Sequence, residues 1–296
     1  VEGPDGGPIV CHKGEIVVLT SVGSKQVPNP DYDPADPGSS ELVIRDFGFG
    51  VAGGTVAVGG VPLPILSWSN STIEARVVGP VSTGQVVVTR NDTGLSSELG
   101  VTLHIGDCGN VVHVSGGGIF PDTPIQDAID NADEGALIII EPGVYWENPI
   151  VWKNVRLQGS GAPSTIINGN PVPAEKVTLW HQKVAALTAA GDMPELGQPF
   201  EAMEGPGILV NVNPGTFGAA QPGFVDGLTV TGAVAGGGVY LFANADYFEV
   251  RNCKINSNQG TFGGGINVGL MGNTDLSNSH VNIHHHYCPA ISRIIA

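Results

Sequence analysis

The sequence predicts an all-β protein in which an N-terminal β-sandwich is followed by a parallel β-helix. Three observations lead to this fold class. Valine and isoleucine dominate the apolar residues, glycine occurs 44 times in 296 residues, and charged residues make up only 14%. β-Branched residues favour strands and glycine favours tight turns. In the last third of the chain, two short patterns repeat at spacings of 25 to 33 residues, which indicates a solenoid.

The charge of the chain limits the classes of partner. Its 28 acidic and 12 basic residues give a net charge of −16. We therefore expect no nucleic-acid partner, because phosphate binding needs a positive surface. No apolar run approaches the roughly 20 residues that span a bilayer, so no membrane span is expected. The chain begins at Val1 without a basic or apolar leader, and we expect a processed, exported form.

Short strands separated by turns fill the first third of the chain. Turn residues recur at about the 8–12 residue spacing that is typical of a sandwich. Cys11 and Cys108 bracket this region, and a disulfide between them would close it end to end, as in exported proteins. Two unrelated buried thiols are the alternative. The expected strands lie in residues 15–22, 41–49, 54–69, 71–79, 84–92 and 100–106.

Residues 56–97 carry a more specific pattern. A Gly-Gly turn is followed by Ser67-Trp68 before a second turn, then by an apolar strand and by GQVVVT at 84–89. This order resembles the IPT/TIG domain, an immunoglobulin-like module, over about residues 40–105. The resemblance implies that Trp68 packs in a core and that the module acts as a spacer or binding platform in a surface protein.

The segment NPDYDPADPG places three carboxylates close together in the chain, at Asp31, Asp33 and Asp36. Several oxygens on one loop could bind calcium. The segment lacks the glycine and the distal glutamate of an EF-hand loop, however, and Asp-Pro pairs are ordinary turn formers. We favour a turn and keep calcium as the alternative; no other cofactor is expected.

A short helix opens the second part of the chain. Thr123 is a suitable N-cap, Pro124 suits the first helical position, and Gln126 completes a capping box. The stretch PIQDAIDNADEGALIIIEPGVYWE resembles the opening of right-handed parallel β-helix proteins of the pectate-lyase type. In that superfamily the helix covers the first coil, and many members are polysaccharide lyases, hydrolases or epimerases.

Two interleaved repeats support stacked coils independently of the resemblance. One series is GPGILV, GGGVYL and GGGINV; the other aligns Val225, Val250 and Ile283. Residues 171–203 interrupt the repeats with helical composition, and Gly191 is a plausible C-cap, so we expect an inserted helix. The expected parts are an extension (1–39), the IPT/TIG module (40–107) and the β-helix (108–296).

The outward face of the first series offers no catalytic group. Side chains alternate along a strand, so Tyr240, Phe242 and Asn267 point outward if Val239 and Leu241 point inward. This face lacks the carboxylate pair or base that glycoside cleavage needs. Tyr240 and Phe242 could stack on a sugar, or pack under a loop or a neighbouring subunit. On another face, Glu249 and Arg251 predict a surface ion pair.

The C-terminal VNIHHHYCPAISRIIA resembles a metal site at first sight. Adjacent histidines alternate between faces, so His284, His285 and His286 cannot easily bind one ion. A contact between His286 and Cys253 on the previous coil is the remaining metal candidate. The apolar ending predicts a segment that caps the last coil or docks onto another molecule. Its residues are His284, Ile291, Ile294 and Ile295.

Two functions follow from these observations. The first is an extracellular or cell-surface structural or adhesive protein that self-assembles through the exposed β-helix end, with copies of itself or other surface proteins as partners. The alternative is a carbohydrate-active β-helix protein that acts on a polysaccharide, either as a lyase, hydrolase or epimerase or as a non-catalytic binding relative. The sequence assigns no catalytic residue and leaves open whether the protein is an enzyme.

Overall fold

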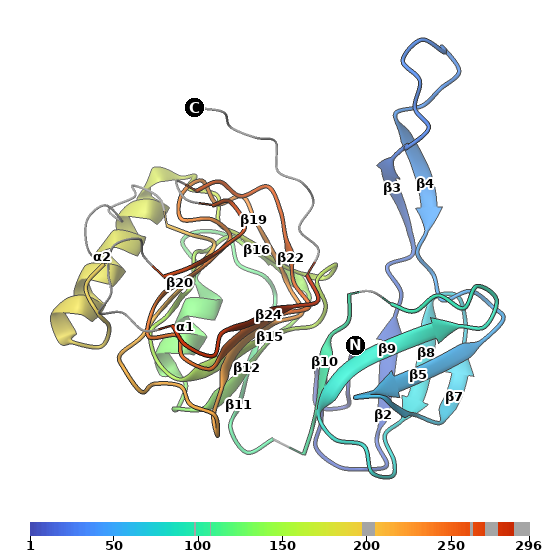
Figure 1. Cartoon of the computed structure of the whole chain (residues 1–296), viewed down its shortest axis with the longest axis horizontal. Coiled ribbons are helices and arrows are strands. Elements are labelled where there is room, and N and C mark those ends of the chain that lie inside the picture. The colour runs from blue at the N-terminus through green and yellow to red at the C-terminus, as the bar shows by residue number, and fades with distance from the viewer. Residues whose placement is uncertain (98, 107, 197–204, 261–262, 270–277, 287–296) are drawn as a thin grey trace.

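The protein consists of two β-rich units that lie side by side in the computed structural model (Figure 1). The structure describes residues 1–296 except 98, 107, 197–204, 261–262, 270–277 and 287–296. The N-terminal unit contains β1 (Ile9–Val10), β2 (Ile16–Thr20), β3 (Ser24–Pro28), β4 (Leu42–Asp46), β5 (Gly54–Val58), β6 (Val61–Pro62), β7 (Ile65–Trp68), β8 (Thr72–Arg76), β9 (Gly84–Arg90) and β10 (Thr102–Ile105).

Two sheets of the N-terminal unit enclose one core. The first has the order β1-β10-β9-β5-β6 and the second the order β2-β8-β7. Alternating residues of β5 and β8, such as Val56 and Ile73, are fully buried in a single cluster, and Trp68 packs against it. The predicted strands are confirmed, because each of the six predicted segments contains at least one strand. The sequence did not predict β1 or β3.

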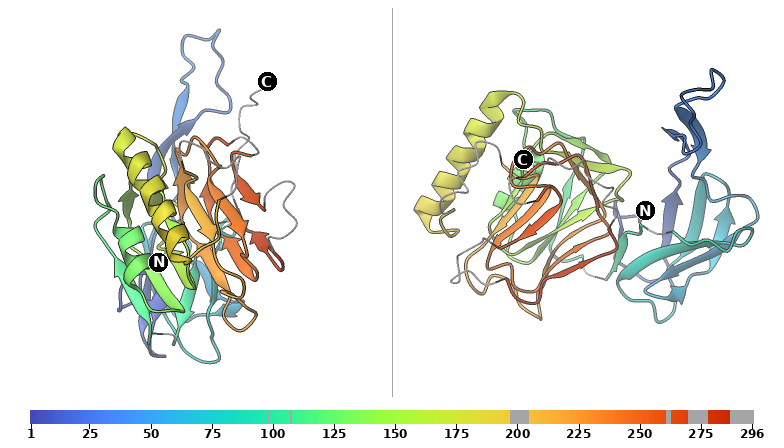
Figure 2. Two further views of the ribbon diagram at one scale, coloured as in Figure 1. Left: turned by 90° about the vertical axis from the view of Figure 1, so that its left-hand side faces the viewer. Right: turned by 45° about the horizontal axis from the view of Figure 1, so that its top comes forward.

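Strands β3 and β4 form a ribbon of their own. They pair with each other in antiparallel register, from Ser24 opposite Asp46 to Pro28 opposite Leu42. The ribbon projects away from the rest of the molecule (Figures 1 and 2). Most of its side chains are exposed.

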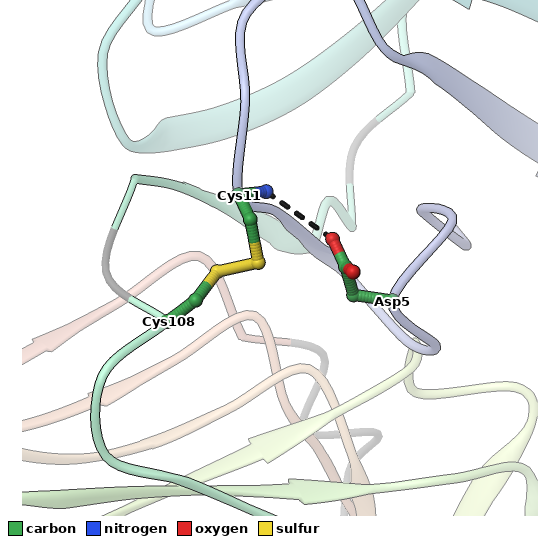
Figure 3. Close-up of side chains that lie close together, drawn as sticks. All are labelled: Asp5, Cys11 and Cys108. Atoms are coloured by element: carbon green, nitrogen blue, oxygen red, sulfur yellow. Dashed lines mark hydrogen bonds between the residues drawn. A yellow bond between two sulfur atoms is a disulfide. The ribbon is translucent and has the colours of Figure 1, made fainter.

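A disulfide joins Cys11 to Cys108, with their Cα atoms 5.6 Å apart (Figure 3). The predicted pairing is confirmed. The bond ties the residue after β1 to the segment between β10 and β11, where the N-terminal unit ends. Asp5 lies beside it and accepts a hydrogen bond from the backbone N–H of Cys11.

Three parallel sheets form the second unit, as in a parallel β-helix. Their orders are β11-β12-β15-β18-β21-β24, β13-β16-β19-β22 and β14-β17-β20-β23. The elements are β11 (Val111–Val114), α1 (Pro124–Asn131), β12 (Ala136–Ile140), β13 (Gly143–Tyr145), β14 (Ile150–Val151), β15 (Val155–Gly159), β16 (Thr165–Asn168), α2 (Ala174–Ala190), β17 (Ile208–Asn211), β18 (Gly223–Asp226), β19 (Thr229–Thr231), β20 (Val239–Ala243), β21 (Phe248–Arg251), β22 (Lys254–Ile255), β23 (Ile266–Val268) and β24 (Asn282–His284).

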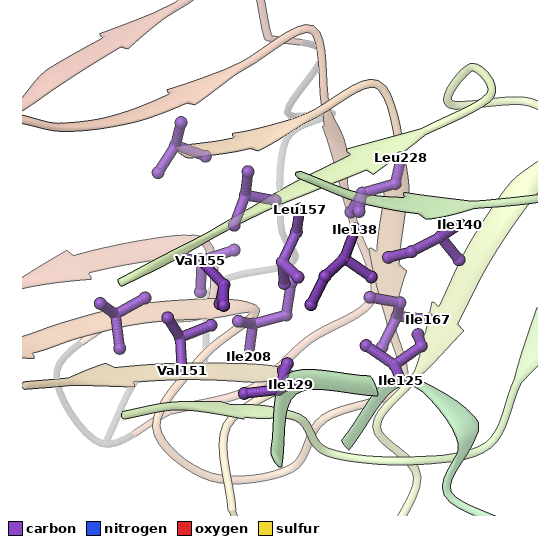
Figure 4. Packing of buried hydrophobic residues seen from close by; sticks show 14 of the residues in the cluster. Ile125, Ile129, Ile138, Ile140, Val151, Val155, Leu157, Ile167, Ile208 and Leu228 are labelled. Atoms are coloured by element: carbon purple, nitrogen blue, oxygen red, sulfur yellow. The ribbon is translucent and has the colours of Figure 1, made fainter. Parts of the chain in front are cut away.

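The register of the coils is the one that the repeats predict. Val225 pairs with Val250, and Val250 with Ile283. Asn252 and His285, two residues after Val250 and Ile283, both adopt positive φ, at 53° and 57°, and form equivalent corners of successive coils. Each strand therefore sends alternate aliphatic side chains into a common core (Figure 4).

Helix α1 closes the first end of this core. Ile125 and Ile129, one turn apart on the same face, are both fully buried in the cluster (Figure 4). The predicted capping box is wrong, because the Thr123 side chain makes no cap hydrogen bond. The Glu147 carboxyl instead accepts hydrogen bonds from the backbone N–H groups of Ile125 and Gln126. Glu147, which is distant in the chain, thus caps the helix in place of the adjacent Thr123.

Helix α2 covers the outer face of the sheet β14-β17-β20-β23. Trp180 and Leu187 pack in one cluster with Tyr240 and Phe242. The helix ends where predicted, at Gly191, whose φ of 78° lies in the left-handed region. The inserted helix is confirmed, and it is a packing element that hides apolar side chains of the sheet.

The outer face of the six-stranded sheet is covered by the N-terminal unit. Thr102 of β10 donates a 2.5 Å hydrogen bond to the fully buried Asp226, which also accepts one from Arg251 at 2.6 Å. Next to it, His104 and Gln158 form a buried 2.8 Å hydrogen bond. The predicted Glu249–Arg251 pair exists but belongs to this largely buried network, because the adjacent unit excludes water from the sheet.

Within the described ranges, no helix is long and apolar enough to cross a membrane.

We expect loss of the disulfide to destabilise the N-terminal unit. Replacing both cysteines (Cys11→Ser with Cys108→Ser) frees a loop with a sequence separation of 97 residues in the unfolded chain. The free energy of unfolding should fall by about 2–5 kcal/mol. Urea denaturation followed by circular dichroism measures the change. The unmodified protein in reductant should match the variant, and an unchanged midpoint after reduction would contradict the prediction.

Candidate functional site

A cleft lies between the two helices of the β-helix unit. Its volume is about 210 Å³. Each helix contributes one face, at the spacing i, i+3, i+4, i+7 that brings side chains into a row. The wall from α1 consists of Thr123, Gln126, Asp127 and Asp130, the wall from α2 of Lys176, Leu179, Trp180 and Lys183, and the remaining lining of Phe120, Pro121, Glu147, Asn148 and Ile150.

Asp130 holds the two walls together. Its carboxylate accepts hydrogen bonds from Lys183 of α2 at 2.5 Å, from Trp152 at 2.8 Å and from Gln126 at 3.0 Å. Gln126 in turn accepts a 2.7 Å bond from the backbone N–H of Ile150. The Lys183–Asp130 ion pair thus crosses the cleft and fixes α2 relative to α1.

Glu147 forms the floor of the cleft at the N-terminus of α1. Only 1% of its surface is exposed, and its two oxygens accept the N–H groups of Ile125 and Gln126 at 3.0 and 2.9 Å. Burial raises the pKa of Glu147 to about 7; Asp127 adds to this rise, while the two backbone donors and Lys176 oppose it. The carboxyl therefore changes protonation near neutral pH.

Lys176 lies opposite Glu147 and is also buried. Its ammonium group donates to the carbonyls of Asn168 and Asn170, at 3.1 and 2.7 Å. Burial lowers the pKa of Lys176 to about 8, and the nearby Glu147 partly offsets this effect. The lysine carries a positive charge at neutral pH, but its hydrogen bonds to the chain already use much of its donor capacity.

Two polar groups of the cleft have no hydrogen-bond partner within the described part of the chain. Asp127 is exposed, and its carboxylate makes no hydrogen bond or ion pair within the described part of the chain. The indole N–H of Trp180 is buried and likewise has no partner there. Asp127 can accept a hydrogen bond, and the rings of Trp180 and Phe120 add apolar surface.

The cleft suits a small, polar, nearly uncharged ligand. Lys183 is neutralised by Asp130, and Lys176 lies near Glu147. No site for a metal ion is indicated in the cleft. Among the described residues, only Asp5, Cys11 and Cys108 bring three potential metal ligands close together, and the two cysteine sulfurs are joined in the disulfide (Figure 3).

The predicted contact residues Tyr240, Phe242 and Asn267 lie outside this cleft. Tyr240 and Phe242 lie beneath α2 and are 2% and 0% exposed. Of the two predicted roles, they therefore pack under another segment of the chain. Asn267 donates to the carbonyls of Gly236 and Gly263 and holds a corner between coils. The prediction that Tyr240 and Phe242 form an open face for a sugar is wrong, because the inserted helix covers both rings.

The carboxylates of the predicted calcium loop serve the loop itself. Asp33 accepts a hydrogen bond from the N–H of Ala35, and Asp36 from that of Gly38. These are the local bonds of Asx-turns. The carboxylates of Asp31, Asp33 and Asp36 do not converge on one point, and this favours the turn that the sequence also indicated.

Cys253 and His286 approach each other without forming a ligand pair. The Cys253 thiol is buried and contacts the carbonyl of Arg251 at 3.0 Å. Burial raises its pKa to about 12, so the thiol is protonated at neutral pH when no metal ion is bound. His286 contacts the backbone carbonyls of Val250 and Cys253 rather than the sulfur. Metal binding by Cys253 and His286 stays a prediction.

The predicted assembly end is only partly within the described residues. His284 is in β24, the last strand of the six-stranded sheet, and is half-buried beside His285. Burial lowers the pKa of His284, and the charge of His285 acts in the same direction. Ile291, Ile294 and Ile295 lie outside the described residues, and assembly through this end stays a prediction.

Sequence reasoning missed the cleft because its walls are far apart in the chain. Two signals were present: the α1 row of Gln126, Asp127 and Asp130, and the α2 row of Lys176, Trp180 and Lys183. Polar side chains in a row on a helix that must also bury apolar surface indicate a facing polar partner. The sequence does not show which segment supplies it.

Comparison with known proteins adds one weak match. No family model and no curated protein matches the chain. Among solved structures, a family 28 exopolygalacturonase from Yersinia enterocolitica is similar at 12% sequence identity and a TM-score of 0.26, over 95% of this chain and 68% of that one. A TM-score of this size supports no inference about fold or activity.

We expect Glu147 to make stability depend on pH. Its pKa lies at about 7 in the folded protein and at an ordinary 4.5 when unfolded, so only the folded state holds this proton in between. The free energy of unfolding should therefore fall as pH rises from about 4.5 to about 7, by roughly 3 kcal/mol from this residue. Urea denaturation across this range measures the fall.

A Glu147→Gln variant isolates this contribution. It cannot titrate, so it should lose the downward slope, while His104 and other titrating groups act equally in both proteins. Equal slopes in the variant and the unmodified protein would show that Glu147 keeps an ordinary pKa.

Proposed function

We propose that this is an exported carbohydrate-binding protein whose binding site is the cleft between α1 and α2. The disulfide supports export, since such bonds persist in oxidising compartments. We assign the β-helix to the pectate-lyase-like superfamily and the N-terminal unit to the IPT/TIG modules. For the latter, two sheets around one core and the packing of Trp68 against Phe49 are the support. This unit then acts as an extracellular spacer or platform.

The lining of the cleft carries the proposal. Sugars present hydroxyl groups, which bind carboxylates, amides and N–H donors, and an apolar ring face, which packs on aromatic side chains. Asp127 and the side-chain oxygen of Asn148 offer hydrogen-bond acceptors, and Phe120 and Trp180 offer the rings. A volume of about 210 Å³ suits one sugar ring rather than a long chain.

The balance of charge favours a neutral sugar. A ligand carboxylate would need an unpaired cation, and both lysines of the cleft already have partners. Asp127, the exposed and unpaired charge, is negative. It would repel an acidic sugar and accept a hydrogen bond from a hydroxyl group.

Glycoside hydrolysis is the second candidate, and one observation favours it. Glu147 has a raised pKa while Asp127 is exposed to solvent, and a carboxyl pair in contrasting environments is the arrangement of a general acid and its partner. Against this, both oxygens of Glu147 accept backbone N–H groups at the end of α1. A group engaged in this way is better suited to hold the helix than to donate a proton, so binding is the better-supported function.

We expect binding to depend on Asp127. On a glycan array that carries neutral and uronate-containing oligosaccharides, the protein should retain a neutral sugar, whose affinity calorimetry then measures. Asp127→Asn should weaken it about tenfold, the value of one hydrogen bond to a charged group. Leu179→Trp, on the rim of the cleft, should block it by filling the space.

Asp133→Asn is the matched control, since Asp133 is an exposed aspartate just beyond the end of α1 and outside the cleft. It should leave the affinity unchanged. An array without bound sugars, or binding that survives both cleft variants, would contradict the proposal.

The same sugars decide between binding and hydrolysis. Incubating each retained oligosaccharide with the protein and measuring released reducing ends tests for cleavage. We expect none. Cleavage that Glu147→Gln abolishes would establish the second candidate instead.

A further inference from the structure

The ribbon of β3 and β4 is an unusually apolar projection. Its exposed apolar side chains include Leu42, 46% exposed, and Ile44, 72% exposed. Val22 and Phe47, at the two ends of the ribbon's base, are also exposed. A two-stranded ribbon alone is marginally stable in water. Apolar side chains on such an element indicate that something else packs against it.

Two positive charges face each other near the base of the ribbon. Lys25 and Arg45 are directly opposite in the register, on the same face as Val27 and Val43. Like charges in this position repel each other. Neither side chain has a hydrogen bond or ion pair within the described part of the chain. In a protein of net charge −16, this basic pair lacks the acidic partner that would stabilise it.

The far end of the ribbon carries the opposite charge. The connecting loop and its edge hold only acidic charges: Asp31, Asp33, Asp36 and Glu41, all exposed. None of them forms an ion pair among the described residues. Asp33 and Asp36 support turns, whereas the carboxylates of Asp31 and Glu41 make no hydrogen bond there. On the face of Lys25 and Arg45, the ribbon is thus positive at its base and negative at its tip. Asp46 lies at the base on the other face, where it accepts hydrogen bonds from Gly48 and Asn70.

This polarity is self-complementary. If two identical ribbons lie antiparallel, the base of each faces the tip of the other, and a two-fold axis creates both contacts at once. Five residues per strand separate base from tip by about 17 Å, so the opposite charges of one ribbon are too far apart to neutralise each other in salt solution. A parallel arrangement would instead place like charges together.

We propose that the β3–β4 ribbon is a pairing arm through which two copies of this chain associate, antiparallel, with Lys25 and Arg45 of each copy against Asp31 and Glu41 of the other. Val27 and Val43, on the face of Lys25 and Arg45, are covered in the pair. The association goes beyond sugar binding and does not depend on it.

Charge reversal at the two ends of the arm tests the proposal. Sedimentation equilibrium of the full chain should show a dimer for the unmodified protein. Lys25→Glu with Arg45→Glu makes base and tip both negative, and Asp31→Lys with Glu41→Lys reverses the two tip charges that face the base of the other copy. Each double variant should raise the dissociation constant by a factor on the order of 100, because each pair contains the repulsion twice.

The mixture of the two double variants is the decisive sample. In a heterodimer, the two glutamates at the base of one chain meet the two lysines at the tip of the other, and the second contact keeps its natural charges. The mixture should therefore restore a dimer, and native mass spectrometry should identify it as one copy of each variant. Association of the unmodified protein should also weaken in high salt.

Lys13→Glu with Arg76→Glu is the matched control. Both are exposed basic side chains of the same unit that bond only backbone carbonyls, and the change in net charge is identical. This variant should remain dimeric. The proposal is overturned if the unmodified protein is monomeric at every concentration, if both arm variants stay dimeric, or if their mixture stays monomeric. Unchanged circular dichroism spectra confirm that the variants fold.

Discussion

The hydrogen bonds between the Glu147 carboxyl and the first turn of α1 are the interaction on which the cleft depends. They anchor a helix whose own sequence provides no working cap, and they place it over the open end of the coil stack. Once α1 is fixed, Asp130 has a defined position, and its bond to Lys183 fixes α2. A buried carboxyl near a buried lysine is costly, since burial disfavours both charges. Replacing them with apolar side chains would give a core but no cleft.

Two of the three sheets of the β-helix unit have covered outer faces in the described part of the chain. The N-terminal unit covers the six-stranded sheet through the buried network around Asp226, and α2 covers the sheet that contains Tyr240 and Phe242. The sheet residues differ between the two contacts: polar side chains of the six-stranded sheet face β10, and aromatic side chains of the other sheet face α2. The two additions to the solenoid therefore serve the same physical need, which is to keep alternate outward residues of the coils from water. The cleft arises at the edge of the second cover.

The sequence repeats predicted the fold because the pattern of one coil can be recognised within a short stretch of the chain. The alignment of Val225, Val250 and Ile283 gave the register of three coils, and the composition of residues 174–190 gave α2. The candidate site could not be derived in this way. Glu147 caps a helix that begins 23 residues earlier in the chain, and Lys183 meets Asp130 across 53 residues. In the same way, local pattern favoured Thr123 as the cap, and tertiary contact overruled it.

The positions of the cleft and the arm relative to each other make the two proposals compatible. Helix α2 lies at one side of the molecule and the β3–β4 ribbon at the other (Figures 1 and 2), so pairing through the ribbons leaves the clefts open. A cleft for one sugar ring buries little ligand surface, and its affinity is limited for that reason. Two clefts on one rigid pair bind a polymeric surface much more tightly than one, because the second binding event is intramolecular. Pairing would thus convert a weak single site into an adhesive one, and it unites sugar binding with the surface-protein role that the domain order of the sequence indicated.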